Sequence, residues 1–477
     1  MQANSMKPAS HDIFDLIVVG AGPAGMAAAA EARAFDMSVA ILDQNAGLGG
    51  QIYRNVANSL LLDSGIFDPD YLRGSALVAD VQKSGAVFLG NSAVWGIECV
   101  ADRSLFSIGI MSDGVAERLL ARRVVLATGA LERPLPIEGW TLPGVMSVGA
   151  AQTLLKRNAV VPAGRTVLAG TGPLLYLFAA QLARASCPPV AVLDTSPRSN
   201  WVKALLHLPG FMASNYFRKG LSLMGEVKRS SRIILNVKHM EARGEEQFRW
   251  LDISVDGRSE RIEADLLLLH QGVVPQVNLA KAAGCSHEWN SERLAFEPLR
   301  DEGFRSSVSG LSIAGDGGGV RGAQAAELEG RIAATQIAGD MGITSGPEIS
   351  RRLQRFRSEL AKVLRGRRFL SVYYRPAPQF RMPADDVIIC RCEEVTAGSV
   401  REAAARGASG PNQLKLFVRA GMGQCQGRLC GLTVTELMAG QQKKMPGEIG
   451  YFHIRAPVCP ITVGALAELN DRTGGRA

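Results

Sequence analysis

The chain has 477 residues, which at roughly 100–200 residues per domain predicts about three folding units and excludes a single small binding module. Hydrophobic residues make up 47% and charged residues 21%, as in ordinary globular proteins, and no apolar run is long enough to cross a bilayer. The net charge of +8 is concentrated between Ser350 and Phe369, which argues against a nucleic-acid-binding surface.

The N-terminal segment MQANSMKPASHD carries one lysine and no apolar block. A secretory signal needs a charged region followed by an apolar run, so we expect no such signal here. A cytoplasmic protein is the resulting expectation.

The first predicted element is a dinucleotide-binding unit. An apolar strand, FDLIVVG, runs into the turn GAGPAG and an alanine-rich helix, and the next strand ends in an acid. The three glycines allow a tight turn, approach of a pyrophosphate and close helix packing, and the acid can bind ribose hydroxyls. A glycine turn chosen only for packing is the alternative. The expected cofactor-binding residues are Gly20, Gly22, Pro23, Ala24, Gly25, Asp43 and Gln44.

A second unit of the same kind follows in the middle of the chain. The strand RTVLAG, the turn GTGPLL, a helix and the strand VAVLD repeat the pattern, with Gly170, Gly172, Pro173 and Asp194 as candidate nucleotide-binding residues. The third glycine position holds Leu175, whose bulk should keep the helix away from the strand. The expected ligand is ATP, ADP or NAD, and a domain that only packs is the alternative.

Two further glycine-marked turns end apolar strands. The first is ATGA at Ala127 to Ala130, and the second is AGDGG at Ala314 to Gly318. Taken alone, either turn indicates only the end of a strand.

A basic helix is predicted from Arg351 to Phe369. Its apolar residues fall on one face at helical spacing and should pack on the body of the protein: Leu353, Phe356, Leu360, Val363 and Leu364. The arginines on the other face could dock an acidic partner or keep a connecting segment soluble.

Four of the eight cysteines are clustered near the C-terminus, as Cys390-Arg-Cys392 and Cys425-Gln-Gly-Arg-Leu-Cys430. In an extended CxC both thiols leave the same face, so one iron could take both, while the second pair closes on another iron. Four thiolates satisfy a [2Fe–2S] cluster. A tetrahedral zinc site has the same ligands and is the structural alternative.

Together these motifs resemble the flavoproteins with two dinucleotide-binding domains, which include thioredoxin reductase and glutathione reductase. The resemblance implies an α/β fold in which FAD binds the first fingerprint, the ATG turn links the domains, and the acid of the late GD pair contacts FAD. It adds Ala127, Thr128, Gly129, Gly315 and Asp316 to the expected cofactor-binding residues. No CxxC or Cx₄C pair lies in these domains, so dithiol chemistry is not expected.

The resemblance also implies a division of the chain. The FAD domain should consist of residues 13–145 and 280–345, with the second nucleotide-binding domain, residues 146–279, inserted between them. A basic helical connector at 346–384, an α-rich [2Fe–2S] domain at 385–445 and a C-terminal tail at 446–477 should follow.

The stretch GGQIYR, the phrase ALERPLPIEGWTLPGVMSVGAAQ and the cysteine cluster narrow the match. They resemble the A chain of heteromeric opine oxidases and of hydroxyproline or proline dehydrogenases, and the B chain of hydrogen cyanide synthase. Gly50 and Gln51 join the expected FAD contacts. The cysteine segment resembles bacterioferritin-associated ferredoxin, although CQGRLC replaces the usual CxxC.

By this resemblance the chain is an FAD- and [2Fe–2S]-containing subunit of a dehydrogenase that oxidises a C–N bond in an opine, imino acid or related amine. A D-amino-acid-oxidase-like FAD subunit would oxidise the substrate, a small third subunit is a further candidate partner, and the final acceptor would be one other than oxygen. Alternatives are a hydrogen cyanide synthase-type subunit, an NAD(P)H-dependent acceptor reductase and a non-catalytic electron-transfer subunit. No catalytic residue is assigned, and a structural role is expected for His270.

Overall fold

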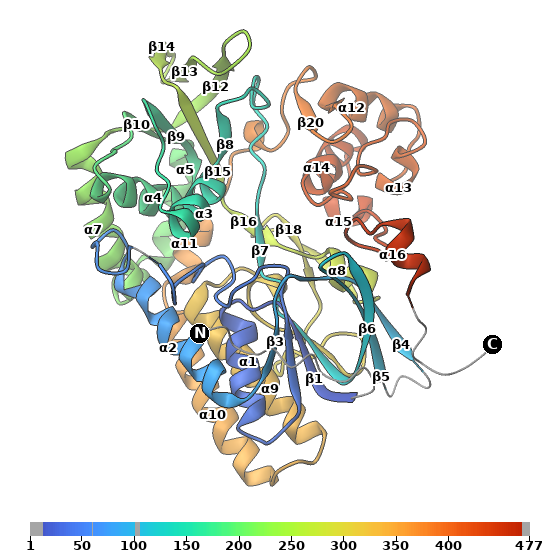
Figure 1. Cartoon of the computed structure of the whole chain (residues 1–477). Coiled ribbons are helices and arrows are strands. Elements are labelled where there is room, and N and C mark those ends of the chain that lie inside the picture. The colour runs from blue at the N-terminus through green and yellow to red at the C-terminus, as the bar shows by residue number, and fades with distance from the viewer. Residues whose placement is uncertain (1–12, 60, 101–104, 470–477) are drawn as a thin grey trace.

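The computed structural model describes residues 13–59, 61–100 and 105–469 (Figure 1). Its first sheet is built around parallel strands whose apolar side chains are buried on both faces, as expected for strands covered by helices. The strand order is β3-β2-β1-β6-β5-β4, and β19 pairs with β6. The strands are β1 (Ile13–Val19), β2 (Val39–Leu42), β3 (Val87–Leu89), β4 (Ser92–Val100), β5 (Leu105–Ser112), β6 (Val115–Leu126) and β19 (Leu311–Ile313).

Three helices, α1, α2 and α9, pack together against this sheet. Helix α1 (Pro23–Arg33) follows the first glycine turn and packs against α9 (Ala323–Asp340), while α2 (Pro69–Ser84) lies beside it. A Cβ on Gly330 of α9 would lie 2.1 Å from the carbonyl oxygen of Ala24. The two helices therefore touch through their backbones, which places the middle of α9 against the start of α1, just after the first glycine turn.

The middle of the chain forms a second parallel sheet of order β11-β10-β9-β15-β8, beside an antiparallel sheet of order β12-β13-β14. Its strands are β8 (Val145–Ser147), β9 (Thr166–Thr171), β10 (Ala191–Asp194), β11 (Arg232–Leu235), β12 (Val237–Arg243), β13 (Trp250–Val255), β14 (Arg258–Glu263) and β15 (Leu266–Gln271). Its helices are α3 (Val148–Asn158), α4 (Pro173–Arg184), α5 (Arg198–Ala204), α6 (Leu208–Met212) and α7 (Asn215–Ser230), with a 3₁₀ turn, η1, at Leu205–His207.

Two crossing strands connect the parts. Strand β7 (Ala130–Glu132) leaves the first sheet, β16 (Val273–Pro275) returns, and the two pair antiparallel. Beyond β16 lie α8 (Asn278–Ala282) and the hairpin β17 (His287–Asn290) and β18 (Ala295–Pro298). The first and second parallel sheets confirm the predicted α/β fold with two Rossmann-like units. The exact division into domains stays a prediction.

The predicted basic helix is broken in the structure. Helix α10 (Gly346–Val363) packs its apolar stripe on α9, as expected, but Gly366 has a left-handed φ of +79° and ends the run. A separate helix, α11 (Arg367–Tyr373), then turns towards α5. Among the arginines, Arg352 is paired with Glu31, so part of this basic face already has partners within the chain.

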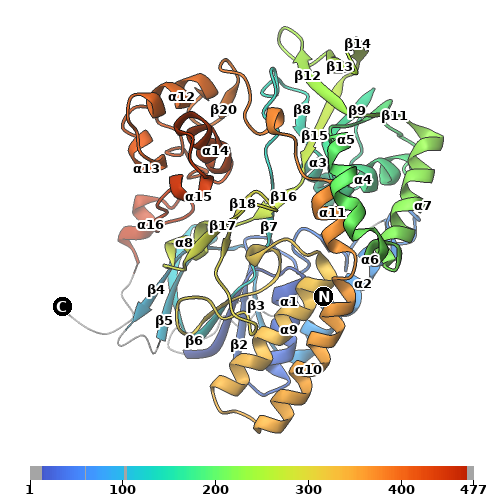
Figure 2. The same ribbon diagram turned by 180° about the vertical axis from the view of Figure 1, so that it is seen from behind.

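The C-terminal part is mainly helical and sits beside the crossing strands, on the side opposite the middle sheet (Figures 1 and 2). It contains a short hairpin of β20 (Ile388–Cys390) and β21 (Val395–Thr396), and the helices α12 (Ala397–Ala405), α13 (Pro411–Leu414), α14 (Gly431–Gln442), α15 (Pro446–Ile449) and α16 (Val463–Ala467). One hydrophobic cluster runs from the first sheet through α8 into this part. No helix among the described residues is both long and apolar enough to cross a bilayer.

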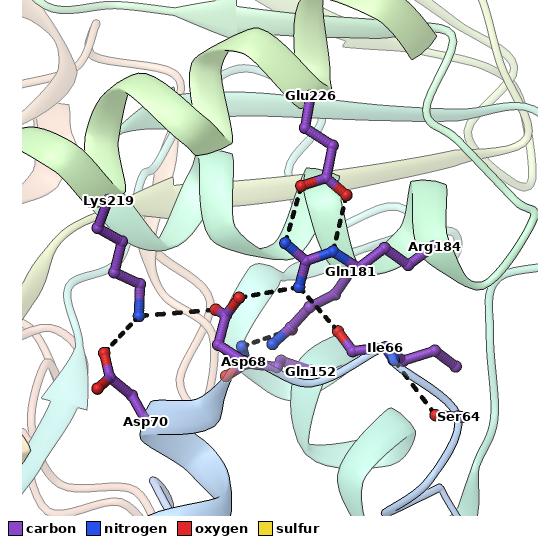
Figure 3. Close-up of polar contacts among 9 residues, drawn as sticks. All are labelled: Ser64, Ile66, Asp68, Asp70, Gln152, Gln181, Arg184, Lys219 and Glu226. Atoms are coloured by element: carbon purple, nitrogen blue, oxygen red, sulfur yellow. Dashed lines mark hydrogen bonds and ion pairs between the residues drawn. The ribbon is translucent and has the colours of Figure 1, made fainter.

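A polar clasp joins the two Rossmann-like units (Figure 3). Arg184 of α4 makes two hydrogen bonds to Glu226 of α7, at 2.7 and 2.8 Å, and another at 2.9 Å to Asp68, which caps α2. Lys219 of α7 lies 2.7 Å from Asp70 of α2. Across the two units, Asp68 and Asp70 of the first unit therefore face Arg184 and Lys219 of the second, which holds the units in one relative orientation, while Glu226 binds Arg184 within the second unit.

Candidate functional site

The first glycine turn is packed so closely that side chains are excluded. A Cβ on Gly25 would lie 1.8 Å from the carbonyl oxygen of Gly20, and a Cβ on Gly50 would lie 2.6 Å from the Cα of Gly22. Gly22 caps α1 without any side-chain hydrogen bond to the helix, so backbone N–H groups at this end remain available. Pro23 follows as the first helical residue, where its missing N–H costs nothing.

Asp43 holds this turn in shape. One carboxylate oxygen accepts a 2.7 Å hydrogen bond from the backbone N–H of Ala21, and the other accepts from the backbone and side chain of Asn45, at 2.8 and 2.7 Å. A carboxylate can accept further hydrogen bonds, so Asp43 can still bind a ribose. Gln44 and Gln51 are exposed, and Gln51 lies beside Thr153 of the other unit.

The two other predicted turns meet the first one. A Cβ on Gly315 would lie 2.7 Å from the Cβ of Ala24, and one on Gly317 would lie 3.1 Å from the hydroxyl of Thr128. The fold thus brings most predicted FAD contacts to one edge of the first sheet. That these residues contact FAD stays a prediction.

Asp316 organises the start of α9. Its carboxylate accepts hydrogen bonds of 2.8 and 3.0 Å from the N–H groups of Arg321 and Gly322, and Gly322 caps α9 without a side-chain bond. Two helix N-termini, those of α1 and α9, therefore border the same edge of the sheet. A diphosphate binds backbone N–H groups at close range. Neither Gly22 nor Gly50 has a side chain that would block this approach, so the residues fit FAD.

The second glycine turn also joins a strand to a helix, but its backbone and its environment differ: Gly172, which caps α4, has a φ of +128°, whereas Gly22 has a φ of −77°. Gly170 packs on the carbonyl of His270, where a Cβ would lie 1.6 Å away. Asp194 is fully buried: Tyr176 of α4 donates a 2.5 Å hydrogen bond to it, and the N–H of Ser196 donates another at 2.7 Å. Burial raises the pKa of Asp194 and of Tyr176. The predicted ribose acceptor is therefore already engaged inside the domain.

A cavity of about 930 Å³ lies between the two units. It reaches Asp316 and Gly322 at one end and Gly172 and Pro173 at the other. Aromatic side chains line the part near the second turn: Tyr176, Trp201, Phe211, Phe369, Tyr373 and Tyr374. The α11 segment is fixed there because Asn200 donates hydrogen bonds to the carbonyls of Tyr373 and Arg375, at 3.0 and 2.8 Å.

His270 lines this cavity and is buried. Its Nδ1 lies 2.5 Å from Glu132 of β7, and the other carboxylate oxygen of Glu132 accepts a 2.9 Å hydrogen bond from the N–H of Gly149, at the start of α3. His270 thus ties β15, a crossing strand and α3 together. This supports the structural role expected for it.

Lys156 of α3 is a feature that the sequence analysis missed. It donates hydrogen bonds of 3.2 and 3.0 Å to the carbonyls of Gln51 and Ile52, across the two units. Burial lowers the pKa of Lys156 to about 7, and the charge of Arg54 adds to this. A lysine in an ordinary amphipathic helix gives no sequence signal of such burial.

The four clustered cysteines come together, but not as predicted. Strand β20 ends at Cys390, and residues 391–394 form a turn, so the CxC segment is not extended and its two thiols do not share one strand face. The prediction treated the motif as a strand, whereas the positive φ of Glu394 turns the chain back into β21. Cys430 caps α14, about one helical turn beyond Cys425, as expected.

The thiols instead meet as two pairs, each formed across the motifs. Interaction with the thiol of Cys430 lowers the pKa of Cys390 to about 6 and raises the pKa of Cys430. Burial raises the pKa of Cys392, whose thiol interacts with that of Cys425. Within the ranges that the structure describes, no group of three or more His, Cys, Asp or Glu side chains has metal-site spacing, so the four thiols lie as two pairs and not as one closed site.

The surroundings fit an anionic cluster. Backbone N–H groups of Cys392, Glu393 and Gly421 help to lower the pKa of the Cys390 thiol, so they lie on the side of its sulfur. Gly423 leaves room beside Cys392, where a Cβ would come within 2.2 Å of the cysteine Cβ. Backbone N–H groups close to a sulfur, together with four thiols from two short segments, suit a [2Fe–2S] group. The ligand role of each cysteine stays a prediction.

A short chain of contacts joins the two sites. The hydroxyl of Thr128 donates a 3.3 Å hydrogen bond to the carbonyl of Gln276, whose N–H donates at 3.0 Å to the carbonyl of Gly129. Two residues on, the side chain of Asn278 donates a 3.1 Å hydrogen bond to the carbonyl of Gln426, which follows Cys425. The ATG turn and the cysteine segment are therefore linked through one strand end.

Buried charges fix the C-terminal part in place, and the sequence analysis missed them. Glu436 of α14 is buried and lies 3.5 Å from Arg133, just after β7, and it also pairs with Arg381. Burial lowers the pKa of Arg133 to about 10. An isolated glutamate in the apolar helix sequence TVTELMAG was the available signal, because buried charges need partners.

Comparison with known proteins agrees with this architecture. Residues 14–342 match the family model of pyridine nucleotide-disulphide oxidoreductases, and residues 388–440 match that of BFD-like [2Fe-2S] binding domains. The opine oxidase A chain from Agrobacterium tumefaciens (strain Ach5) is 43% identical over 463 residues, which is 96% of this chain and 92% of the relative. The second family model spans all four clustered cysteines.

Two further relatives cover nearly the whole chain. The HcnB chain of hydrogen cyanide synthase from Pseudomonas protegens is 32% identical, over 94% of this chain and 97% of the relative. The solved structure of L-proline dehydrogenase from P. horikoshii superposes with a TM-score of 0.71 and 21% identity, over 95% of this chain and 79% of that one, which supports the fold. The chain therefore belongs to the FAD oxidoreductases of the pyridine nucleotide-disulphide oxidoreductase family, in the group of the opine oxidase A chains, with a BFD-like [2Fe-2S] binding domain.

Proposed function

We propose that this chain is the FAD- and [2Fe–2S]-containing subunit of a heteromeric dehydrogenase that oxidises the C–N bond of an opine, imino acid or related amine. A D-amino-acid-oxidase-like partner would take two electrons and two protons from the substrate, leaving an imine. This chain would receive the electrons and pass them to an acceptor other than oxygen. The 43% identity to an opine oxidase A chain, against 32% to the cyanide synthase chain, favours the opine type.

FAD accepts electrons in pairs and a [2Fe–2S] cluster carries them singly, so both groups on one chain suit a relay. In this proposal the N-termini of α1 and α9 bind and orient the FAD phosphates and ring, and Asp43 holds the ribose. The four cysteines hold the cluster. The chain positions its cofactors and needs no dedicated base of its own.

The observation that carries the proposal is the contact of Asn278 with Gln426. Asn278 lies two residues beyond Gln276, which is hydrogen-bonded to the ATG turn, and Gln426 is the neighbour of Cys425. A cofactor in the first glycine turn and a cluster on the cysteines would therefore be joined by a continuous stretch of packed protein.

The middle unit is poorly suited to bind NAD(P)H as a hydride donor. Asp194 is engaged by Tyr176, and α11 lines the cavity beside Gly172. Both features oppose an NAD(P)H-dependent reductase. We propose that any nucleotide here, ATP, ADP or NAD, has a structural role.

Anaerobic mixing tests the proposal. The purified chain, alone and with its co-purified partner, is mixed with an opine, an imino acid or NADH while flavin absorbance is followed. Bleaching by the opine or imino acid only in the presence of the partner is the expected result. Bleaching of the isolated chain would mean autonomous catalysis, and rapid bleaching by NADH would overturn the proposal.

A further inference from the structure

A group of large apolar side chains is exposed around the cysteine segment. Leu416 is 83% exposed, Phe417 46%, Met422 49% and Leu429 41%. All four fall within 14 residues that also contain Cys425. Single exposed apolar residues are normal, but a local concentration of them marks an interaction surface.

The cluster site opens on this side. Cys390 and Cys430 are buried, whereas Cys392 is exposed and Cys425 is half-buried. Cys392 follows the exposed Arg391 and lies against Gly423, the residue after Met422. The cluster face, as we call this surface, consists of Arg391, Leu416, Phe417, Arg419, Met422 and Leu429.

The charge of the second cysteine segment has one sign, whereas Glu393 and Glu394 follow Cys392 in the first. Between Glu402 and Glu436 the sequence has no acidic residue, but it has four basic ones: Arg406, Lys415, Arg419 and Arg428. Arg419 is paired with Glu393, and Arg428 donates only to the carbonyls of Cys425 and Val458 among the described residues. A partner surface with carboxylates around an apolar centre would complement this face.

The amount of exposed apolar surface also indicates the kind of partner. Brief encounters between redox carriers use small, charge-rich contacts, whereas permanent subunit interfaces resemble a domain core cut in half. Four large apolar side chains beside the cysteines suit a permanent contact. A diffusible carrier would leave them in water for most of its cycle.

We propose that the cluster face is the docking surface for the substrate-oxidising partner subunit, whose contact area is apolar with a rim of carboxylates. The inference rests on the proposed function and adds where the partner binds. Electrons would then enter the chain at the exposed Cys392 side of the cluster. Leu416 and Phe417 would be buried at the centre of the interface.

The test uses the full chain with its cofactors and the flavin-containing subunit that co-purifies with it. Leu416→Glu and Phe417→Glu place a charge at the centre of the proposed interface. Ile343→Glu is the matched control, because Ile343 is 41% exposed but lies between α9 and α10, with no other large exposed apolar residue near it in the sequence. Affinity for the purified partner is measured for each variant, together with flavin, iron and visible absorbance.

We expect each cluster-face variant to bind the partner about 30-fold more weakly than the control variant, with unchanged flavin and iron content. Raising the salt concentration should weaken the unmodified complex, because the rim is charged. Equal affinities of the Leu416→Glu and Ile343→Glu variants would overturn the inference.

Hydrogen exchange of the unmodified complex decides the case in which a variant loses its cluster. Amides of residues 415–429 should exchange at least about tenfold more slowly in the complex than in the isolated chain, and those of residues 201–212 should not change. Protection only outside 415–429 would overturn the inference. Failure of the proposed function looks different: the complex forms through this face, but no opine or imino acid bleaches its flavin.

Discussion

The two glycine turns of this chain share one sequence pattern and each joins a strand to a helix, yet they offer different sites. At the third position the first turn needs Gly25, because a Cβ there would lie 1.8 Å from the carbonyl oxygen of Gly20. The second turn holds Leu175, completely buried in α4. The pattern therefore predicts the strand, turn and helix in both places, although the first turn excludes a Cβ at the third position and the second accommodates a leucine there.

The two acids differ even more. Asp43 supports the backbone of its own turn, whereas Asp194 is covered by Tyr176 and bound by Ser196. Tyr176, the residue after Leu175, donates a hydrogen bond to Asp194 and so occupies the carboxylate that a ribose would need. The comparison teaches that a fingerprint indicates a fold, and that its neighbours determine whether a ligand can use it.

Exchanging the third residues should give the largest effect. Gly25→Leu forces a side chain into the carbonyl of Gly20, so we expect the chain to lose bound FAD almost completely. Leu175→Gly should keep its FAD but lose about 3–5 kcal/mol of unfolding free energy, since it removes a buried side chain and loosens a helix. Flavin content per chain and denaturant unfolding measure both. Normal FAD content in Gly25→Leu would contradict the comparison.

Substitution of the two acids, Asp43 and Asp194, should change the Kd for FAD by different but smaller amounts. Asp43→Asn weakens both a ribose contact and the support of the Ala21 N–H, so the Kd for FAD should rise about 10–100-fold, as expected for a charged hydrogen bond. Asp194→Asn should leave that Kd unchanged. Fluorescence titration of the apoprotein with FAD provides the values. A similar rise in both variants would show that the two acids act alike.

Breaking the clasp between the units should lower the unfolding free energy by a smaller amount. Arg184→Met leaves Asp68 and Glu226 without their shared cation in a half-buried position, so we expect a loss of about 1.5–3 kcal/mol in unfolding free energy. Arg232→Met, which breaks the exposed pair with Glu260, should cost below about 1 kcal/mol. Urea denaturation of both variants measures these losses. Equal losses would mean that the clasp stabilises the chain no more than an exposed ion pair does.

Lys156 gives a pH-dependent effect. Its pKa is about 7 in the folded chain because of burial, against about 10.4 when unfolded. Between these values the unfolded chain binds a proton that the folded one lacks, so its contribution to stability rises with pH, by up to about 1.4 kcal/mol per pH unit. Lys156→Met should remove this slope between pH 8 and about 9.5, and Lys83→Met, at an exposed position, should keep it. Parallel slopes in all three proteins would refute the assignment.

Most of the fold was predictable because its signals are local. The strand-turn-helix units, the stripe of Leu353, Phe356 and Leu360 and the cysteine cluster each occupy a short stretch of sequence. What could not be predicted depends on contacts between distant segments, such as Tyr176 with Asp194 or Arg133 with Glu436. The prediction of an extended CxC segment was wrong for a local reason, because the turn after Cys390 contains no glycine or proline that would indicate it.

Cofactor analysis of the chain, purified without oxygen and without any partner, tests the central claim most directly. The account predicts one FAD, two irons and two acid-labile sulfides per chain, as a [2Fe–2S] cluster requires, and a visible spectrum containing both flavin and cluster bands. A chain without flavin, or one whose four clustered cysteines hold a single zinc ion and no iron, would contradict it.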